Sequence, residues 1–495
     1  MKKFKKLLSY NTNSIIIPYI IIAFVLVISQ TNRNAYGYEP DFIKGMGIEN
    51  FEVSADFTRV TTTGAIFLIN KTIGKIEIYQ RIGKERKLAE VTISTKFNPI
   101  FNKMPQDEGF EYVWSKGQRK DSKIIISGDS LIRFYDLKEI NIRLFFSPIF
   151  EKVNPSNKGL IALDDDGGIA IMPPTNISLN DYQINIEDNE WKFNSDSKMP
   201  VLFVGICPPR IFDLERSRWP VIHYSSHIQR YPSDQQIKEY SNYAKVLEMH
   251  QWIWKNRYTN NQLCSQERYN NCDGVNTPFW ADNSASTLNN KYVPDNEKEL
   301  LRVISKAHEY KMLVAVYFSG MEINQIAILK EVSRLQKQYN IDGIYLDGLL
   351  TNTKEGPLDA YLTARELRKL FGDNGWLNFH NSHNGYFAPF VQTYMDFVTT
   401  SEHNNFDRWI STTFNISNAI GGLWPEIPYF WPDSSKNIQD ARTFLKNLVD
   451  LSMKYHNRIL FLTGEQGQWR FWRLYFTSEE LEFLKKYYLK PLGGN

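Results

Sequence analysis

The sequence has few cysteines, and this shortage limits the chemistry open to it. Its 495 residues contain three of them, Cys207, Cys264 and Cys272. Cys264 and Cys272 flank the polar loop "CSQERYNNC", which offers too few ligands for zinc and predicts a disulfide in an oxidising compartment. Cys207 follows the apolar run "VLFVGI" and is expected to be a buried thiol, because no matching His and Asn can be assigned to make it a protease nucleophile.

Surplus charge and the common cofactor motifs are also missing. The formal net charge is +3 at pH 7, and no dense Lys/Arg stripe follows residue 40, so we expect no nucleic-acid partner. No glycine-rich phosphate loop follows a predicted strand, which disfavours a nucleotide-binding doubly wound fold. His380 and His383 hint at a metal, but the His-x-His of a metal-dependent amidohydrolase is absent. The sequence therefore predicts neither metal nor cofactor.

The N-terminus has the pattern of an export signal. Four lysines among the first six residues precede a charge-free, mostly apolar run at 15–28. This run is shorter than the ~20 residues that a membrane span needs, and Ala35 and Gly37 provide small residues for cleavage. We predict a signal peptide or N-terminal anchor over 1–37. The protein would then be secreted, periplasmic or attached to the membrane at the cell surface.

Two patterns of secondary structure divide the rest of the chain. Segments such as "KIEIYQRI" and "INIRLFFSPIF" alternate apolar and polar residues and predict an N-terminal β-sandwich domain over 38–210. From 211 to 495, continuous apolar strands alternate with amphipathic helices. One helix begins with a Ser233–Gln236 capping box, and another is predicted to be capped by Asp295. The predicted fold class is α/β, a (β/α)8 TIM barrel preceded by the sandwich.

Polar residues gather where the predicted barrel strands end. Function in such barrels lies at the carboxyl ends of the strands. The residues there are Glu248, His250, Tyr317, Ser319, Asp347, His380, Asn381, Glu402, His403, Glu426 and Glu465. For Glu248 and Glu426, a salt bridge or cap and a substrate contact both remain open. The chain is also rich in aromatic residues, with 12 Trp, 27 Tyr and 31 Phe, which either line a sugar site or fill a large core.

Two acids on separate strands suit cleavage of a glycosidic bond. One carboxylate attacks the anomeric carbon or activates water, and the other donates a proton to the leaving oxygen. Asp347 and Glu402 are the best pair, because each follows an apolar strand and one strand, "GWLNFHNS", lies between them.

The segments "DGIYLDG", "ARELRKLFGDNGWLNFHNS" and "MDFVTTSEH" resemble the barrel of retaining α-glycosidases, the melibiase or α-galactosidase-like superfamily, and related bacterial glycosidase-like proteins. The likeness covers roughly residues 200 to 480. It implies a nucleophilic Asp at the end of the fourth strand and an acid/base at the end of the sixth. The count fits if "VLFVGICPP" or "PVIHYSS" supplies the first strand. The better-known members use Asp as acid/base, so Asp407 competes with Glu402.

These residues predict an exported glycoside hydrolase that acts on a polysaccharide or glycoconjugate. Asp347 would be the nucleophile and Glu402 the acid/base, and other side chains would bind hydroxyls or stack on sugar rings: His380, Asn381, His403, Glu465, Trp252, Trp254 and Trp424. The alternatives are a non-catalytic carbohydrate-binding or transglycosylating relative, and an envelope structural protein. The sequence leaves the oligomeric state, the sugar and the anomer open.

Overall fold

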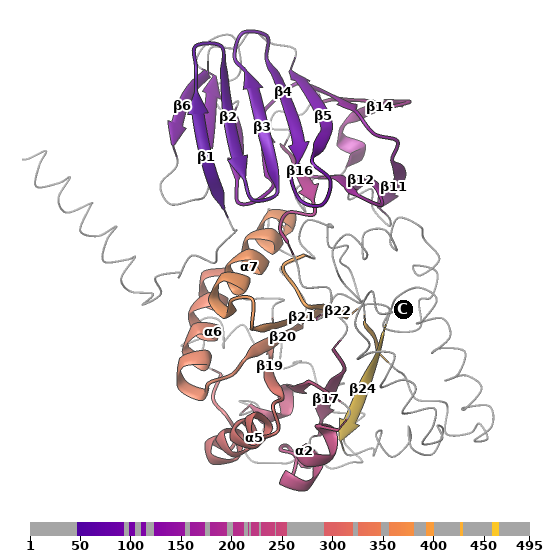
Figure 1. Ribbon diagram of the computed structural model, residues 1–495. Helices are drawn as coiled ribbons and strands as arrows, with labels where there is room; N and C mark the ends of the chain where they lie inside the picture. Colours follow the sequence, from indigo (N-terminus) through magenta and orange to yellow (C-terminus); the bar gives the residue numbers. More distant parts are fainter. Residues whose placement is uncertain are drawn as a thin grey trace, which may run out of the picture. The chain divides into compact units, whose positions relative to one another are not determined.

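In the computed structural model (Figure 1), the described residues are 47–93, 99–103, 110–114, 123–153, 159–173, 179–195, 201–211, 216, 219–226, 229–242, 244–254, 292–319, 325–347, 356–380, 393–399, 426–428 and 458–464. The chain divides into two compact units, Met1–Asp41 and Phe42–Asn495, and all described residues belong to the second. The predicted signal segment and the cysteines at 264 and 272 lie outside the described residues.

The first half of the described chain forms two antiparallel sheets of eight strands each. In spatial order, the first sheet contains β1 (Ile48–Val53), β2 (Phe57–Thr62), β3 (Ala65–Asn70), β4 (Lys75–Gln80), β5 (Arg86–Ile93), β10 (Glu139–Leu144), β15 (Glu190–Asn194) and β14 (Gln183–Glu187). The second contains β11 (Ile149–Val153), β12 (Gly159–Asp164), β13 (Gly167–Met172), β16 (Val201–Cys207), β9 (Leu131–Tyr135), β8 (Lys123–Ser127), β7 (Phe110–Trp114) and β6 (Pro99–Lys103).

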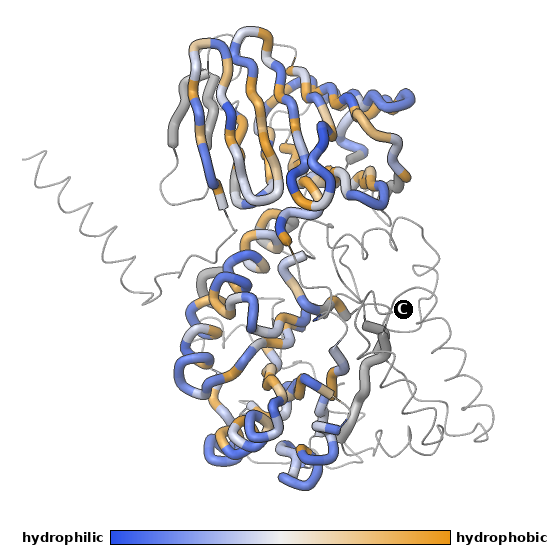
Figure 2. The backbone as a smooth tube through the Cα atoms, viewed as in Figure 1, coloured by the Kyte–Doolittle hydropathy of each residue, from blue (hydrophilic) through white to orange (hydrophobic). Residues whose placement is uncertain are grey.

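The two sheets share one apolar core. Along β4 and β10, residues alternate between buried and more exposed, as the sequence pattern predicts. Figure 2 colours the strands of the first sheet by hydropathy and shows hydrophobic and hydrophilic residues mixed along them. Phe67 and Ile142 of the first sheet belong to the same buried cluster as Phe134 and Val204 of the second. We call these two packed sheets the two-sheet unit.

Two central strands of the second sheet, β13 and β16, are buried on both faces. All six residues of β13 are buried, and so are six of the seven in β16, in contrast to the alternation in β4. The side chains that point away from the two-sheet core, such as Phe203 and Cys207, join a cluster with residues of the barrel described next. Cys207 is a fully buried free thiol, as the sequence predicts, and burial raises its pKa.

Eight parallel strands then close into a barrel, with the last strand pairing back onto the first. They are β17 (Val221–Ser225), β18 (Val246–Met249), β19 (Leu313–Ser319), β20 (Gly343–Asp347), β21 (Trp376–His380), β22 (Phe397–Thr399), β23 (Glu426–Pro428) and β24 (Arg458–Gly464). The first barrel strand comes from "PVIHYSS", whereas "VLFVGIC" forms β16 of the second sheet. β20 is therefore the fourth barrel strand and β22 the sixth.

Four described α-helices connect the first five barrel strands: α2 (Asp234–Tyr240), α5 (Glu297–Glu309), α6 (Gln325–Tyr339) and α7 (Gly356–Phe371). The connections after β21 lie outside the described residues, so a complete (β/α)8 alternation stays a prediction. Within the described chain, no helix has the length and apolar character needed to cross a membrane.

The helix caps follow the sequence with one correction. The Ser233–Gln236 capping box is present at α2. The cap of α5 was predicted at Asp295, but Asn296 accepts the hydrogen bond from the Glu299 amide instead. Asn caps a helix as well as Asp does. Asp295 pairs with Arg230 at 2.6 Å, which removes it from competition for the cap.

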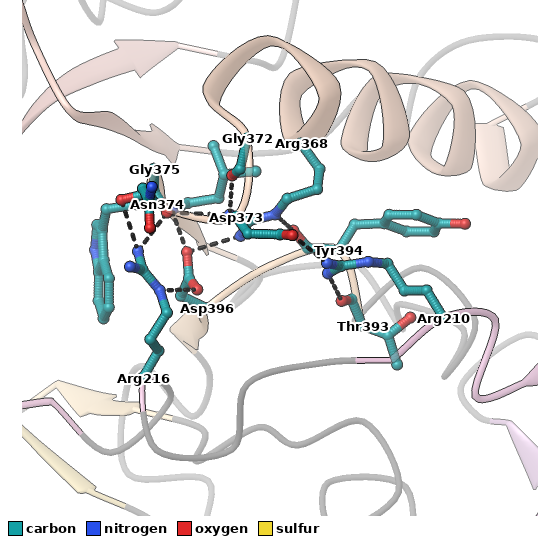
Figure 3. A network of polar contacts seen from close by, with 12 residues as sticks. Arg210, Arg216, Arg368, Gly372, Asp373, Asn374, Gly375, Thr393, Tyr394 and Asp396 are labelled. Atoms are coloured by element: carbon teal, nitrogen blue, oxygen red, sulfur yellow. Dashed lines mark hydrogen bonds and ion pairs between the residues drawn. The ribbon is translucent and has the colours of Figure 1, made fainter. Parts of the chain in front are cut away.

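A buried aspartate holds together the end of the barrel where its strands begin (Figure 3). Asp396, directly before β22, accepts hydrogen bonds from Arg216 (3.2 Å), Arg368 (2.7 Å) and the Leu377 amide (2.9 Å). Burial alone would raise the pKa of Asp396, but the two guanidinium groups and the amide outweigh it and lower the pKa. The negative charge of Asp396 is balanced by two guanidinium groups and an amide, which indicates a structural role.

A second buried aspartate joins the two-sheet unit to the barrel. Asp129, in the turn between β8 and β9, is fully buried and lies 3.1 Å from Nε of Arg365 on α7. Its carboxylate also accepts from the Tyr394 hydroxyl and the Gly47 amide, and its own amide donates to the Tyr361 hydroxyl at 2.9 Å. Residues more than 200 positions apart in sequence therefore share one buried ion pair.

Candidate active site

Asp347 is the last residue of β20 and is partly exposed, so it reaches the end of the barrel that we call the mouth. In the strand register it lies between Ser319 of β19 and His380 of β21. The strand begins with Gly343, where an added Cβ would lie 1.9 Å from the carbonyl oxygen of Trp376. The close approach of β20 to β21 therefore requires glycine here, and it fixes the strand that carries Asp347.

The Tyr317 hydroxyl donates a hydrogen bond to Oδ2 of Asp347 at 3.0 Å. Tyr317 pairs in register with Tyr345, two residues before Asp347, and a tyrosine is long enough to reach this diagonal neighbour. Burial, and then the charge of Asp347, raise the pKa of Tyr317 well above its ordinary value. The hydroxyl therefore stays protonated and remains a donor throughout the neutral pH range.

Four rings pack against one another below Asp347, and we call them the ring cluster: His223, His250, Tyr317 and Tyr345. The His223 centroid lies 4.9 Å from that of His250 and 4.8 Å from that of Tyr345. His250 lies 4.9 Å from Tyr317, and Tyr317 lies 5.9 Å from Tyr345. The cluster joins β17, β19 and β20 with His250, the residue directly after β18, at the level just beneath the mouth.

Glu248 of β18 lies inside the barrel with no exposed surface. Its Oε1 accepts from the Trp376 indole (2.9 Å) and from Asn378 (2.9 Å). Its Oε2 accepts from Asn378 and lies 3.1 Å from Nδ1 of His223. Of the two roles left open by the sequence, the hydrogen-bonding role fits Glu248, because a side chain with no exposed surface cannot touch a substrate.

Two of the three predicted stacking tryptophans, Trp252 and Trp254, lie among the described residues and differ in environment. Trp252 is partly exposed, and its indole donates to the Ser225 hydroxyl at 3.3 Å, which leaves the predicted stacking role open to it. Trp254 is 2% exposed and donates to the Tyr317 carbonyl at 2.9 Å. Trp254 therefore supports β19 from within the core, and its burial argues against a stacking platform.

Most of the other predicted site residues fall outside the description. These are Asn381, Glu402, His403, Asp407, Trp424 and Glu465, together with the side chain of His380. β22 ends at Thr399, three residues before position 402, and the backbone of His380 lies beside that of Asp347. The described residues contain no group of three or more His, Cys, Asp or Glu that could hold a metal.

Sequence reasoning missed two features of this site. Tyr317 stood among the strand-end residues, but its pairing with Asp347 depends on the register of β19 and β20. The contact of His223 with Glu248 joins residues that pair across β17 and β18. In both cases the signal was present as an acid or tyrosine at a position where barrel strands usually have an aliphatic residue.

No protein-family model matches the sequence, and no curated protein matches it. Similar solved structures include the GH31 dextranase of Flavobacterium johnsoniae complexed with glucose, with 8% identity, a TM-score of 0.43, and coverage of 90% of this chain and 68% of that one. They also include a cycloalternan-forming enzyme from Listeria monocytogenes (9% identity, TM-score 0.37, 89% and 49% coverage) and a maltogenic alpha-amylase from Thermotoga neapolitana (8%, 0.34, 55% and 76%). At these identities and TM-scores, the likeness supports no conclusion about the activity of this chain.

Proposed function

We propose that the protein is an exported glycoside hydrolase that cleaves a carbohydrate chain or glycoconjugate by a retaining, two-carboxylate mechanism. One observation carries the proposal: a partly exposed aspartate ends the fourth strand of a closed parallel barrel and accepts a hydrogen bond from a buried tyrosine. The carboxyl end of the strands is where such barrels carry out their chemistry. The catalytic barrel would span 211–495 as a (β/α)8 fold, with the sandwich over 38–210.

In this proposal Asp347 is the nucleophile. The carboxylate of Asp347, which accepts a hydrogen bond from Tyr317, would attack the anomeric carbon while Glu402 gives its proton to the leaving oxygen. A covalent glycosyl ester would form on Asp347. Glu402 would then take a proton from water, which displaces Asp347 and releases the sugar with its original anomeric configuration.

The test is a screen of the purified protein against aryl α- and β-glycosides, with Asp347→Asn as the matched control for contaminating activity. We expect hydrolysis of at least one α-glycoside by the wild type and loss of this activity in the variant. Proton NMR of the first-formed product should show the α-anomer. A β-anomer would replace the retaining mechanism with an inverting one, and equal activity in the variant would remove Asp347 from catalysis.

The acid/base is tested separately with Glu402→Ala and Asp407→Ala. Removal of the acid/base of a retaining enzyme slows substrates with poor leaving groups most, because activated aryl groups need little protonation. We expect this pattern, with rescue by azide, in the Glu402 variant. If it appears only in the Asp407 variant, the acid/base role moves to Asp407 and the nucleophile is unaffected.

A further inference from the structure

The burial of Glu248 needs an explanation that stability does not supply. Trp376, Val221, Val246 and Ala315 form an apolar cluster inside the barrel, and Glu248 lies two residues after Val246 on the same face of β18. An aliphatic side chain there would continue that cluster. Burying a carboxylate instead costs several kcal/mol before its hydrogen bonds compensate. A costly acid one layer below the mouth suggests a role in the site.

The hydrogen bonds of Glu248 dictate the state of its histidine partner. Asn378 donates to both carboxylate oxygens, and Trp376 donates to one of them. With both oxygens acting as acceptors, Nδ1 of His223 must carry the hydrogen that completes the 3.1 Å contact with Oε2. Glu248 thus selects one tautomer of His223 and holds the plane of its ring.

The orientation of His223 is passed on through ring contacts. His223 packs edge-on against both His250 and Tyr345, at interplanar angles of 61° and 74°. Tyr317, whose hydroxyl bonds to Asp347, packs against the same two rings. Because rings packed against one another cannot rotate independently, the ring plane of His223 limits where the Tyr317 hydroxyl can lie.

We propose that Glu248 is a positioning residue for the nucleophile. It fixes His223 as the Nδ1–H tautomer, and the ring cluster then holds the Tyr317 hydroxyl on Oδ2 of Asp347. This inference rests on the proposed function for its catalytic meaning, but the arrangement of donors that it describes can be measured without a substrate.

The test is Glu248→Gln in the full-length chain. Glutamine keeps the shape of glutamate but has only one oxygen. That oxygen is needed at the Oε1 position, which accepts from Trp376 and Asn378, so the amide nitrogen takes the Oε2 position. The nitrogen donates, and Nδ1 of His223 must then be an acceptor. We expect ¹⁵N NMR to show that His223 changes from the Nδ1–H to the Nε2–H tautomer. The signals of His308, whose Nε2 faces Asp342 at 2.7 Å, should stay unchanged and serve as an internal reference. An unchanged His223 would overturn the proposal.

Two further measurements distinguish a positioning role of Glu248 from a non-specific structural effect of the substitution. The side-chain ¹³C signal of Asp347, assigned by its loss in Asp347→Asn, should titrate at a higher pH in Glu248→Gln, because the Tyr317 hydroxyl no longer donates to the carboxylate. Where a substrate has been found, kcat should fall about 10- to 100-fold with little change in KM. The control is Glu331→Gln, another buried glutamate, which bonds to Arg334 on α6 outside the barrel wall.

The outcomes are distinguishable. A shifted Asp347 titration in Glu248→Gln but not in Glu331→Gln supports the positioning role, even if no glycoside is ever cleaved. If the His223 tautomer changes while the Asp347 titration and kcat stay as in the wild type, Glu248 is structural and the proposal is wrong. If no glycoside is cleaved but both NMR changes are seen, the proposed function is wrong and the positioning role of Glu248 is still supported.

Discussion

The core of the two-sheet unit and the interior of the barrel are both buried, yet different side chains fill them. The core between the sheets consists of Ile, Val, Leu, Ala and aromatic residues, with Trp191 and Phe134 among the largest. The barrel interior begins with a small apolar cluster and then continues with Glu248, His223 and Asn378, each almost fully buried.

The two interiors differ in how their side chains contribute to stability. Apolar contacts between the sheets stabilise the folded state in proportion to the apolar surface that they bury, at roughly 25 cal/mol per Å². Polar groups inside the barrel bring desolvation costs that hydrogen bonds only offset. Stability alone would favour apolar side chains in both interiors, so the polar barrel interior supports the proposed site. The following variants test this contrast, from the largest expected effect to the smallest.

Asp347→Asn should separate activity from stability most sharply. Loss of the nucleophile should lower kcat by three orders of magnitude or more, equivalent to about 4 kcal/mol or more of transition-state stabilisation. The residue is partly exposed at the mouth, so the melting temperature should stay within a few degrees of the wild type. Calorimetry alongside the kinetic assay checks both parts. A large loss of stability would show that Asp347 stabilises the fold.

Asp396→Ala should have the opposite profile at the other end of the barrel. It leaves two buried guanidinium groups without their carboxylate, which should cost about 3–5 kcal/mol of unfolding free energy. Asp373→Ala is the matched control from the same network, because Asp373 pairs with Arg210 but its own side chain is largely exposed (Figure 3). Urea unfolding measures both. Equal effects would mean that burial at Asp396 is unimportant.

The stabilisation from Asp396 should also depend on pH. Its pKa is lowered in the folded protein, so the folded state binds this proton less readily than the unfolded state. The stabilisation is therefore complete above the ordinary carboxyl pKa of about 4 and is lost as the pH falls through the lower folded value. The stability gap between wild type and Asp396→Ala should accordingly shrink in acid. A gap that stays constant to the lowest accessible pH would contradict this.

Ile142→Val removes one methylene group from the core of the two-sheet unit and tests how much that core contributes to stability. Ile142 is 1% exposed between the sheets, and this change typically costs 0.5–1.5 kcal/mol, roughly. Activity per folded molecule should not change. Val53→Ala, at a 53% exposed position of β1, is the control and should change stability little. A loss of activity beyond the unfolded fraction would show that the two-sheet unit affects the site directly.

His308→Gln should give the smallest effect, with the opposite pH dependence to Asp396. The hydrogen bond to Asp342 raises the pKa of His308, so the folded protein holds this proton more tightly than the unfolded chain. Its stabilisation is complete below about pH 6.5 and is lost as the pH rises through the folded pKa. Wild type and variant should differ by less than about 1 kcal/mol at pH 6 and less still at pH 9. A gap that widens with pH would contradict the pairing.

Local patterns in the sequence predicted the strands, several helices and the place of Asp347 well. Alternation identified β4 and β10, and the acid after "GIYL" is the end of the fourth barrel strand. These features depend on neighbouring residues, which share a strand or one turn of helix. The position of the α5 cap failed by one residue because Asp295 and Asn296 suit the role equally, and only the distant Arg230 decides between them.

Features that depend on strand register or domain packing could not be predicted. The donor to Asp347 depends on how β19 lies against β20, and a shift of two residues would have brought Ser319 or Ala315 level with Tyr345 instead of Tyr317. The partners of Glu248 come from β17 and β21, the second of them 130 residues away. No pattern within one segment contains that information.

The ion pair between Asp129 and Arg365 has a consequence for how this gene can evolve. A barrel inherited without the first 200 residues would contain a buried arginine with no counter-charge, and a two-sheet unit inherited alone would contain a buried aspartate with the same defect. Recombination that exchanged either half for a foreign one would meet this penalty at once. The two halves should therefore descend together, and the identities at positions 129 and 365 should change only as a pair.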